Sequence, residues 1–134
     1  MKKLTNKKMQ IVIPLWQTPL SHQANIGVRK DKWGRIITYK KSELAAFQQQ
    51  LGMLIRSQCT KRGIKRIMGP YSCTASFYLK NHRRPDMTNL WKTVEDSLEG
   101  ILFDNDRYCE KLFLNIEYDE LNPRLEIEVT PLSV

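Results

Sequence analysis

Two acidic points separated by a helical stretch are the residues of this chain best suited to chemistry. Asp86 follows Pro85, and Asp106 ends the turn Asp104, Asn105, Asp106 some 20 residues later. Hydrolysis of a phosphodiester needs an activated water and compensation of charge on the phosphoryl oxygens, and Mg²⁺ held by carboxylates supplies both. A helix of this length followed by a tight turn can return the chain to its starting sheet edge. We therefore expect the two carboxylates to converge.

Each residue of this candidate site also has an ordinary structural explanation. Asp86 can cap the helix that follows it, which is a common use of Asp. Lys92 either stabilises negative charge on a phosphate or pairs with Asp96 on the helix surface. At 100° per residue, however, Asn89, Lys92 and Asp96 emerge from one side of the helix. Together with the acids they predict a site for metal-assisted hydrolysis.

Hydrophobic periodicity predicts the elements that position these residues. Strands are expected at residues 10–15, 71–79, 109–118 and 124–130, where β-branched and aromatic residues are frequent. Helices are expected from Ser42 until Gly63 and from Asp86 until Gly100, where apolar residues recur at spacings of three and four. The order β-α-β-α-β-β predicts an α+β fold, with a small mixed sheet packed against two main helices.

Charge is divided unevenly along the chain, whose formal net charge is +8. Residues 1–70 contain 15 Lys or Arg against 2 acids, a balance of +13, whereas residues 71–134 contain 7 against 12, a balance of −5. A basic half that meets a polyanion and an acidic half that holds divalent cations fit an enzyme acting on nucleic acid. A basic surface that is merely solvated is the alternative.

Residues 16–41 form a long loop with room for a small hairpin, and long loops in small domains are often functional. Its aromatic residues are expected to stack on bases of a nucleic-acid strand while its cations contact phosphates. These residues are Arg29, Lys30, Lys32, Trp33, Arg35, Tyr39, Lys40 and Lys41. The alternative is a solvated loop with two aromatic anchors. His82, in a basic turn, is expected to contact DNA or solvent, and His22 is isolated in the loop.

Length and composition predict one domain over residues 1–134, in which residues 1–9 are a flexible basic arm. Cys59, Cys73 and Cys109 form no CxxC pair, which leaves no zinc framework and fits packing residues in a reducing cytoplasm. No apolar run reaches the length of a membrane span, so we expect a cytoplasmic protein without a membrane partner. No P-loop or dinucleotide fingerprint occurs, so no small-molecule cofactor is expected.

The segment that contains both acidic points resembles the signature of the RusA-type Holliday junction resolvases. That signature is close to R-x-D-x-D-N-x-x-K, followed by D-x-L and then by a D-D or N-D pair. The residues that carry the resemblance are Arg84, Asp86, Asn89, Lys92, Asp96, Leu98, Asn105 and Asp106. It covers about 25 residues strongly, and the remaining elements fit the layout of the family loosely.

The resemblance implies a homodimeric, Mg²⁺-dependent endonuclease, with Mn²⁺ as the alternative ion. Such enzymes make paired nicks across four-way DNA junctions in recombination and repair, and they are often encoded by prophages. By position, Asp86 and Asp106 become metal-binding catalytic acids and Lys92 the catalytic lysine. The supporting residues are Thr88, Asn89, Asp96 and Asn105. The basic residues expected to contact DNA are Arg83, Arg84, Lys40 and Lys41.

Thr88 stands where the family pattern has its second aspartate. A neutral hydroxyl is a poorer Mg²⁺ ligand than a carboxylate, so metal affinity should fall unless Asp96, Asp104 or a water substitutes. The rival hypothesis is therefore a protein that binds junctions through its basic surface without cutting them. A third hypothesis is a basic interaction module that binds no DNA.

Overall fold

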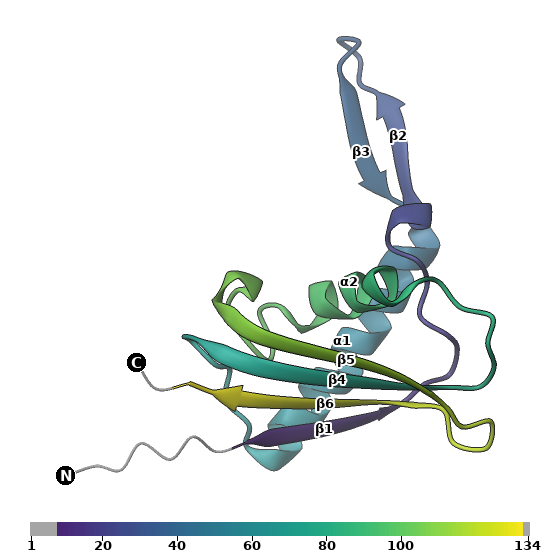
Figure 1. Cartoon of the computed structure of the whole chain (residues 1–134). Coiled ribbons are helices and arrows are strands. Elements are labelled where there is room, and N and C mark those ends of the chain that lie inside the picture. Colours follow the sequence, from purple (N-terminus) through teal and green to yellow (C-terminus); the bar gives the residue numbers. More distant parts are fainter. Residues whose placement is uncertain (1–7, 133–134) are drawn as a thin grey trace.

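A four-stranded mixed sheet forms the centre of the structure, a computed structural model that describes residues 8–132 (Figure 1). Its strands lie in the order β1 (Met9–Pro14), β6 (Arg124–Pro131), β4 (Tyr71–Leu79) and β5 (Cys109–Tyr118). β6 is antiparallel to both of its neighbours, whereas β4 and β5 are parallel. The connection between the parallel strands contains helix α2 (Met87–Leu98), which therefore runs back along the sheet.

Buried and partly exposed side chains alternate along β4, and this pattern shows which face of the sheet the helices cover. Its odd-numbered residues from Tyr71 to Leu79 are buried, and the residues between them are partly exposed. Helices α1 (Ser42–Arg62) and α2 pack on the buried face and against each other. Their apolar stripes complete one core, which includes Leu51 and Ile55 from α1 and Leu90, Val94 and Leu98 from α2.

The ends of both helices follow the signals in the sequence. Asp86 caps α2, because its side chain accepts a hydrogen bond from the backbone N–H of Asn89 at 2.9 Å. Gly63 ends α1 with a φ of 64°, a left-handed conformation that glycine adopts without strain. Gly100 has a φ of 84° and turns the chain away after α2.

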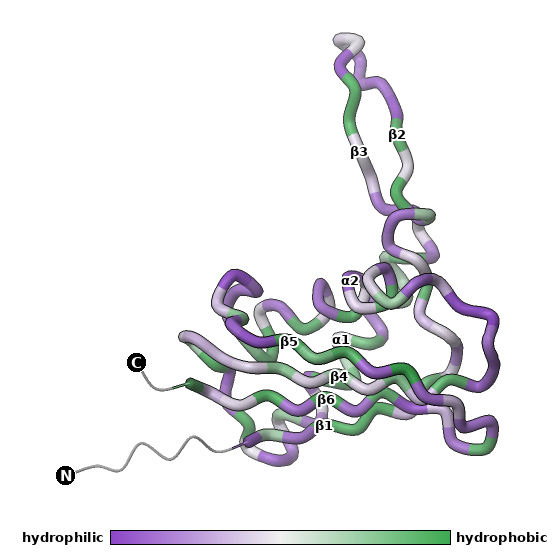
Figure 2. Tube along the Cα trace, in the orientation of Figure 1, coloured by the Kyte–Doolittle hydropathy of each residue, from purple (hydrophilic) through white to green (hydrophobic). Residues whose placement is uncertain are grey.

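The predicted loop at residues 16–41 contains a complete β-hairpin that projects from the sheet and helices (Figure 1). Its strands, β2 (Ile26–Lys30) and β3 (Ile36–Lys40), pair only with each other within the described residues. Figure 2 shows hydrophobic stretches on both strands, far from the core. The exposed residues there include Val28, Trp33 and Ile36.

The predicted α+β class and the element order are confirmed, with the hairpin as an additional small sheet. β4 and β5 have the predicted bounds, and β1 begins at Met9, one residue inside the predicted basic arm. Residues 1–7 of that arm lie outside the described residues. None of the helices in the described part of the chain is long and apolar enough to cross a membrane.

The three cysteines are free, and two of them pack in the core as predicted. Cys59 and Cys73 are buried, and burial raises the pKa of Cys73 to about 12. A thiol with so high a pKa is a poor nucleophile at neutral pH. These two cysteines therefore belong to the packing of the fold.

Candidate active site

Helix α2 carries a capped acid at its start. The carboxylate of Asp86 accepts two hydrogen bonds from the Asn89 side-chain amide, at 3.2 and 3.1 Å, in addition to the one from its backbone. The backbone N–H of Asn89 is the main cause that lowers the pKa of Asp86, and the side chains of Asn89 and Thr88 add to it. The amide oxygen of Asn89 accepts a hydrogen bond from the Gln23 backbone at 3.2 Å. Asp86 is thus an ionised helix cap tied to the loop before the hairpin.

A second group of polar side chains lies at the last turns of α2. It consists of Lys92, Glu95 and Asp96 of the helix and Asp106 of the following turn, and we call it the Glu95 cluster. The ammonium of Lys92 is 3.3 Å from Asp96 Oδ1 and 3.9 Å from Glu95 Oε1. Partial burial lowers the pKa of Lys92, but the neighbouring carboxylates of Asp96 and Glu95 outweigh it and raise the pKa above its usual value. Lys92 therefore presents a permanent positive charge.

Asp106 meets Glu95 within this cluster. It is the first residue of the short 3-10 helix η2 (Asp106–Tyr108), which Asn105 caps by accepting a hydrogen bond from the Arg107 N–H at 2.9 Å. The carboxylate of Asp106 lies close enough to Glu95 to raise its pKa. Burial raises the pKa of Glu95 and the charge of Asp106 raises it further, whereas Lys92 and the indole N–H of Trp91 act in the opposite direction.

The two predicted metal acids therefore belong to different groups in this structure. Asp86 begins α2, and Glu95 follows nine residues later, which corresponds to about 13 Å along the helix axis. Because Asp106 lies beside Glu95, it sits near the other end of the helix from Asp86. No three acidic, His or Cys side chains among residues 8–132 come together as a metal site. The structure brings Asp106 to Lys92, and Asp86 to Asn89.

Asp96 is contacted by basic side chains from three segments. Its Oδ2 lies 3.2 Å from His22 Nε2 and 3.7 Å from Lys40 Nζ, and its Oδ1 lies 3.3 Å from Lys92 Nζ. It is thus a poor candidate to replace the carboxylate missing at Thr88, which is exposed beside Asp86. Asp96 instead positions Lys92 and links it to the loop and to the base of the hairpin.

Glu95 is the site residue that sequence reasoning missed. It sits at the border of the apolar stripe of α2, and its relation to Lys92 at i−3 is visible in the sequence. Its relation to Asp106 depends on how the turn after α2 folds back, which no spacing in the sequence shows. Two adjacent carboxylates suit Mg²⁺, which usually takes one or two from the protein and completes its shell with water and substrate phosphates. Glu95 and Asp106 fit that requirement.

The predicted DNA contacts fall into two places. Arg84 donates from Nε to the Tyr118 hydroxyl at 3.1 Å, and the ring of His82 contacts the ring of Tyr118 in a tilted arrangement with 3.7 Å between centroids. This group, with the exposed Arg83, lies at the carboxyl ends of β4 and β5. The other predicted contacts, Lys40 and Lys41, lie at the base of the hairpin.

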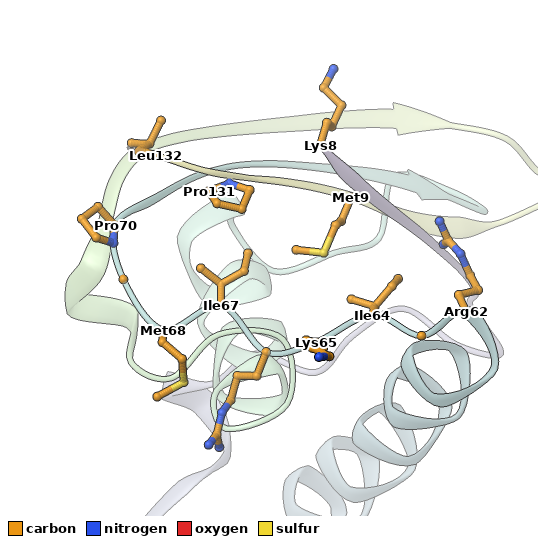
Figure 3. Close-up of a pocket in the computed structure, with 13 residues that line it drawn as sticks. Lys8, Met9, Arg62, Ile64, Lys65, Ile67, Met68, Pro70, Pro131 and Leu132 are labelled. Atoms are coloured by element: carbon orange, nitrogen blue, oxygen red, sulfur yellow. The ribbon is translucent and has the colours of Figure 1, made fainter. Parts of the chain in front are cut away.

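A cavity of about 590 Å³ lies between the end of α1 and the beginning of β1 (Figure 3). Met9 and Ile67 turn toward each other inside it, and Lys8 extends away from it. None of the residues that line it is acidic. The cavity is therefore no candidate for the metal site.

The sequence profile of the family described as Endodeoxyribonuclease RusA matches residues 18–130. The chain belongs to the RusA family. The match includes the hairpin, Asp86 and the whole Glu95 cluster, so it confirms the resemblance drawn from the signature residues. No curated protein matches this chain. RusA-family proteins are endodeoxyribonucleases that resolve Holliday junctions, and they generally depend on a divalent metal.

The capping role of Asp86 can be separated from any chemical role by substitution. Asp86→Ala should lower the melting temperature, because the first turn of α2 loses its acceptor, whereas Asp86→Asn should keep most of it. The folded pKa lies below the ordinary 3.8, so the charged cap stabilises the protein at neutral pH and loses this contribution as the pH falls through the folded pKa. Calorimetry from pH 7 to pH 2 measures both effects. A melting temperature of Asp86→Ala equal to that of the unmodified chain at pH 7 would contradict the cap.

Proposed function

We propose that this RusA-family protein is a Mg²⁺-dependent, structure-specific endonuclease that resolves four-way DNA junctions by paired phosphodiester hydrolysis. The observation that carries the proposal is the Glu95 cluster, where Lys92 pairs with Glu95 and Asp96 on α2 and Asp106 approaches from η2. Family membership supports the endonuclease activity, and the basic first half of the chain supports a polyanionic substrate.

The residues of the Glu95 cluster have distinct parts in this proposal. Glu95 and Asp106 are the residues that would hold Mg²⁺, which supplies an activated water and neutralises phosphoryl charge when bound. Lys92 places its ammonium against the phosphoryl oxygens, where negative charge grows in the transition state. Asp96 positions Lys92, because its Oδ1 lies 3.3 Å from the ammonium. Its other oxygen, Oδ2, lies 3.2 Å from His22 Nε2, which fixes the carboxylate.

We further propose that the protein acts as a homodimer joined along β5. This strand pairs with β4 on one side only, and its other edge exposes Leu112 and Phe113, at 40% and 61%. Lys111 and Glu117 lie on the same face of the sheet and have no ion-pair partner within residues 8–132. An antiparallel pairing centred on Leu114 would place each Lys111 opposite the other copy's Glu117, which is a self-complementary contact.

This pairing would bring Asp86 of one copy close to Asp106 of the other. It sets Tyr118 of one copy opposite Glu110 of the other, and Tyr118 holds Arg84, two residues before Asp86. The Arg84–Asp86 segment of one copy would therefore lie beside the start of β5 in the second copy, close to that copy's Asp106. In this proposal each of the two sites that paired nicking requires draws on both copies.

The metal role of Asp106 predicts a loss of cleavage without a loss of binding. Asp106→Asn should abolish Mg²⁺-dependent nicking of a synthetic four-way junction, and Lys92→Met should slow it by about 100-fold or more. Both variants should bind the junction in EDTA as the unmodified chain does. Glu99→Gln is the control, because Glu99 is an exposed acid just after α2 that has no part in the proposed site. Undiminished nicking by Asp106→Asn would overturn the proposed site.

Thr88 favours a second candidate function, a junction-binding protein that does not cut. If this function holds, the unmodified chain binds junctions with a steep dependence on salt and produces no nicks with Mg²⁺ or Mn²⁺. Thr88→Asp should then restore nicking, because it adds one hard carboxylate beside Asp86. Thr88→Asn is the control of similar size without the charge. Nicking by the unmodified chain would exclude this candidate.

The dimer surface predicts a charge-reversal pattern. Lys111→Glu should shift the protein from dimer toward monomer, because it sets two like charges opposite each other at both ends of the contact. Adding Glu117→Lys to the same chain should restore the dimer with the charges exchanged. Sedimentation velocity in low salt measures the populations, and Glu120→Lys, a change at an exposed position outside the strand, is the control. A Lys111→Glu variant that dimerises normally would exclude this surface, and a monomeric unmodified chain would exclude the homodimer.

A further inference from the structure

The tip of the hairpin presents a tryptophan that the fold does not use. Trp33 is 68% exposed, and no part of the core touches it. Lys32 Nζ lies 4.4 Å and the Arg35 guanidinium carbon 4.9 Å from the centre of its ring. A large apolar ring on a projecting arm gains nothing from folding, so its position points to a partner.

The tip is ordered by its own hydrogen bonds. Asp31 Oδ1 accepts from the backbone N–H groups of Trp33 and Arg35, both at 2.9 Å, and Asp31 Oδ2 accepts from Arg35 Nε at 2.8 Å. Gly34 has a φ of 79°, which allows the tight turn between them. Because the turn is already in place, a partner that meets Trp33 loses little entropy in ordering it.

Tyr39, the other aromatic residue of the hairpin that is expected to stack on bases, also has a structural role within the hairpin. It pairs across the hairpin with Gly27 and covers it, so that a Cβ on Gly27 would lie 2.3 Å from its ring. An aromatic side chain over a cross-strand glycine stiffens such a ribbon. Trp33, at 68% exposure against 43% for Tyr39, is therefore the more accessible aromatic residue of the arm.

The base of the hairpin is tied to the candidate active site. The backbone N–H of Lys41 donates to the Asn25 carbonyl at 2.8 Å, and Lys40 Nζ donates to Gln48 Oε1 of α1 at 2.7 Å. Lys40 also lies 3.7 Å from Asp96, the carboxylate that holds Lys92. The arm is therefore held by the same ion-pair network as the proposed catalytic lysine.

We propose that Trp33 is a base-stacking residue that recognises the branch point of the DNA substrate. The proposal rests on the function proposed above and deepens it. The charge of the arm favours nucleic acid, because Arg29, Lys30, Lys32 and Arg35 surround the tip and its one acid, Asp31, is already bonded. Stacking on a base exceeds an exposed cation–π contact, and the cations displaced from the ring can move to phosphates.

Branched DNA differs from a duplex in the exposure of base faces, on which Trp33 would stack. In a continuous duplex both faces of each base are covered by its neighbours, whereas the base pairs at a branch point can expose a face. Phosphates are present in both, so the cations of the arm contribute to either substrate. Trp33 thus raises affinity for the junction selectively.

The experiment compares binding of one four-way junction with binding of a duplex of the same sequence at fixed salt, in EDTA. Trp33→Ala should weaken junction binding on the order of tenfold and change duplex binding less than twofold, and Trp33→Phe should retain most of the junction affinity. Ile36→Ala is the matched control, because Ile36 lies in the same arm with 71% exposure. It should bind both substrates as the unmodified chain does.

A fluorescent adenine analogue placed at the branch point gives an independent measurement. Its emission should be quenched when the unmodified chain or Ile36→Ala binds, and remain unquenched with Trp33→Ala. Equal losses of duplex and junction affinity, or unchanged quenching by Trp33→Ala, would overturn the role of Trp33 while leaving the nuclease assignment intact. A chain that binds no DNA would instead overturn both.

Discussion

The burial of one side of α2 against the sheet is the interaction on which the candidate site depends. Leu90, Val94 and Leu98 are fully buried, and a helix of 12 residues has little stability without such packing. Because the helical period is 3.6 residues, burial of this stripe also fixes the rotation of the helix. Lys92, Glu95 and Asp96 then emerge beside η2, where Asp106 meets them. The packing of the core thus sets the geometry of the chemistry.

Asp96 connects parts of the chain that are remote in sequence. His22 contacts it from the loop, Lys40 from the base of the hairpin and Lys92 from the preceding turn of the same helix. Exposed ion pairs stabilise a protein little, so the significance of this network lies in orientation. Substrate binding and the proposed catalytic lysine are in this way physically adjacent.

The separation of Asp86 from Asp106 follows from the topology. α2 runs from the carboxyl end of β4 back to its amino end, because β5 starts at that end, parallel to β4. The acid before the helix and the acid after it must therefore lie at opposite ends of α2 in a single chain. The dimer proposed along the free edge of β5 would relate the two ends of α2 by a two-fold axis, and would so bring together between two copies the acids that the topology separates within one.

Local patterns in the sequence were sufficient to predict the elements and part of the site. The period of two in β4, the stripe of α2, the cap at Asp86 and the breaks at Gly63 and Gly100 act over a few residues, and the structure has each of them. The hairpin was anticipated without its strand bounds, and its rigid tip depends on the side chain of Asp31. Tertiary structure alone decided three features of the site. These are the proximity of Glu95 to Asp106, the basic side chains that contact Asp96, and the separation of Asp86 from Asp106. Periodicity determines which way a residue faces on its own element, but only the packing of elements, driven by burial of their apolar faces, determines what that residue meets.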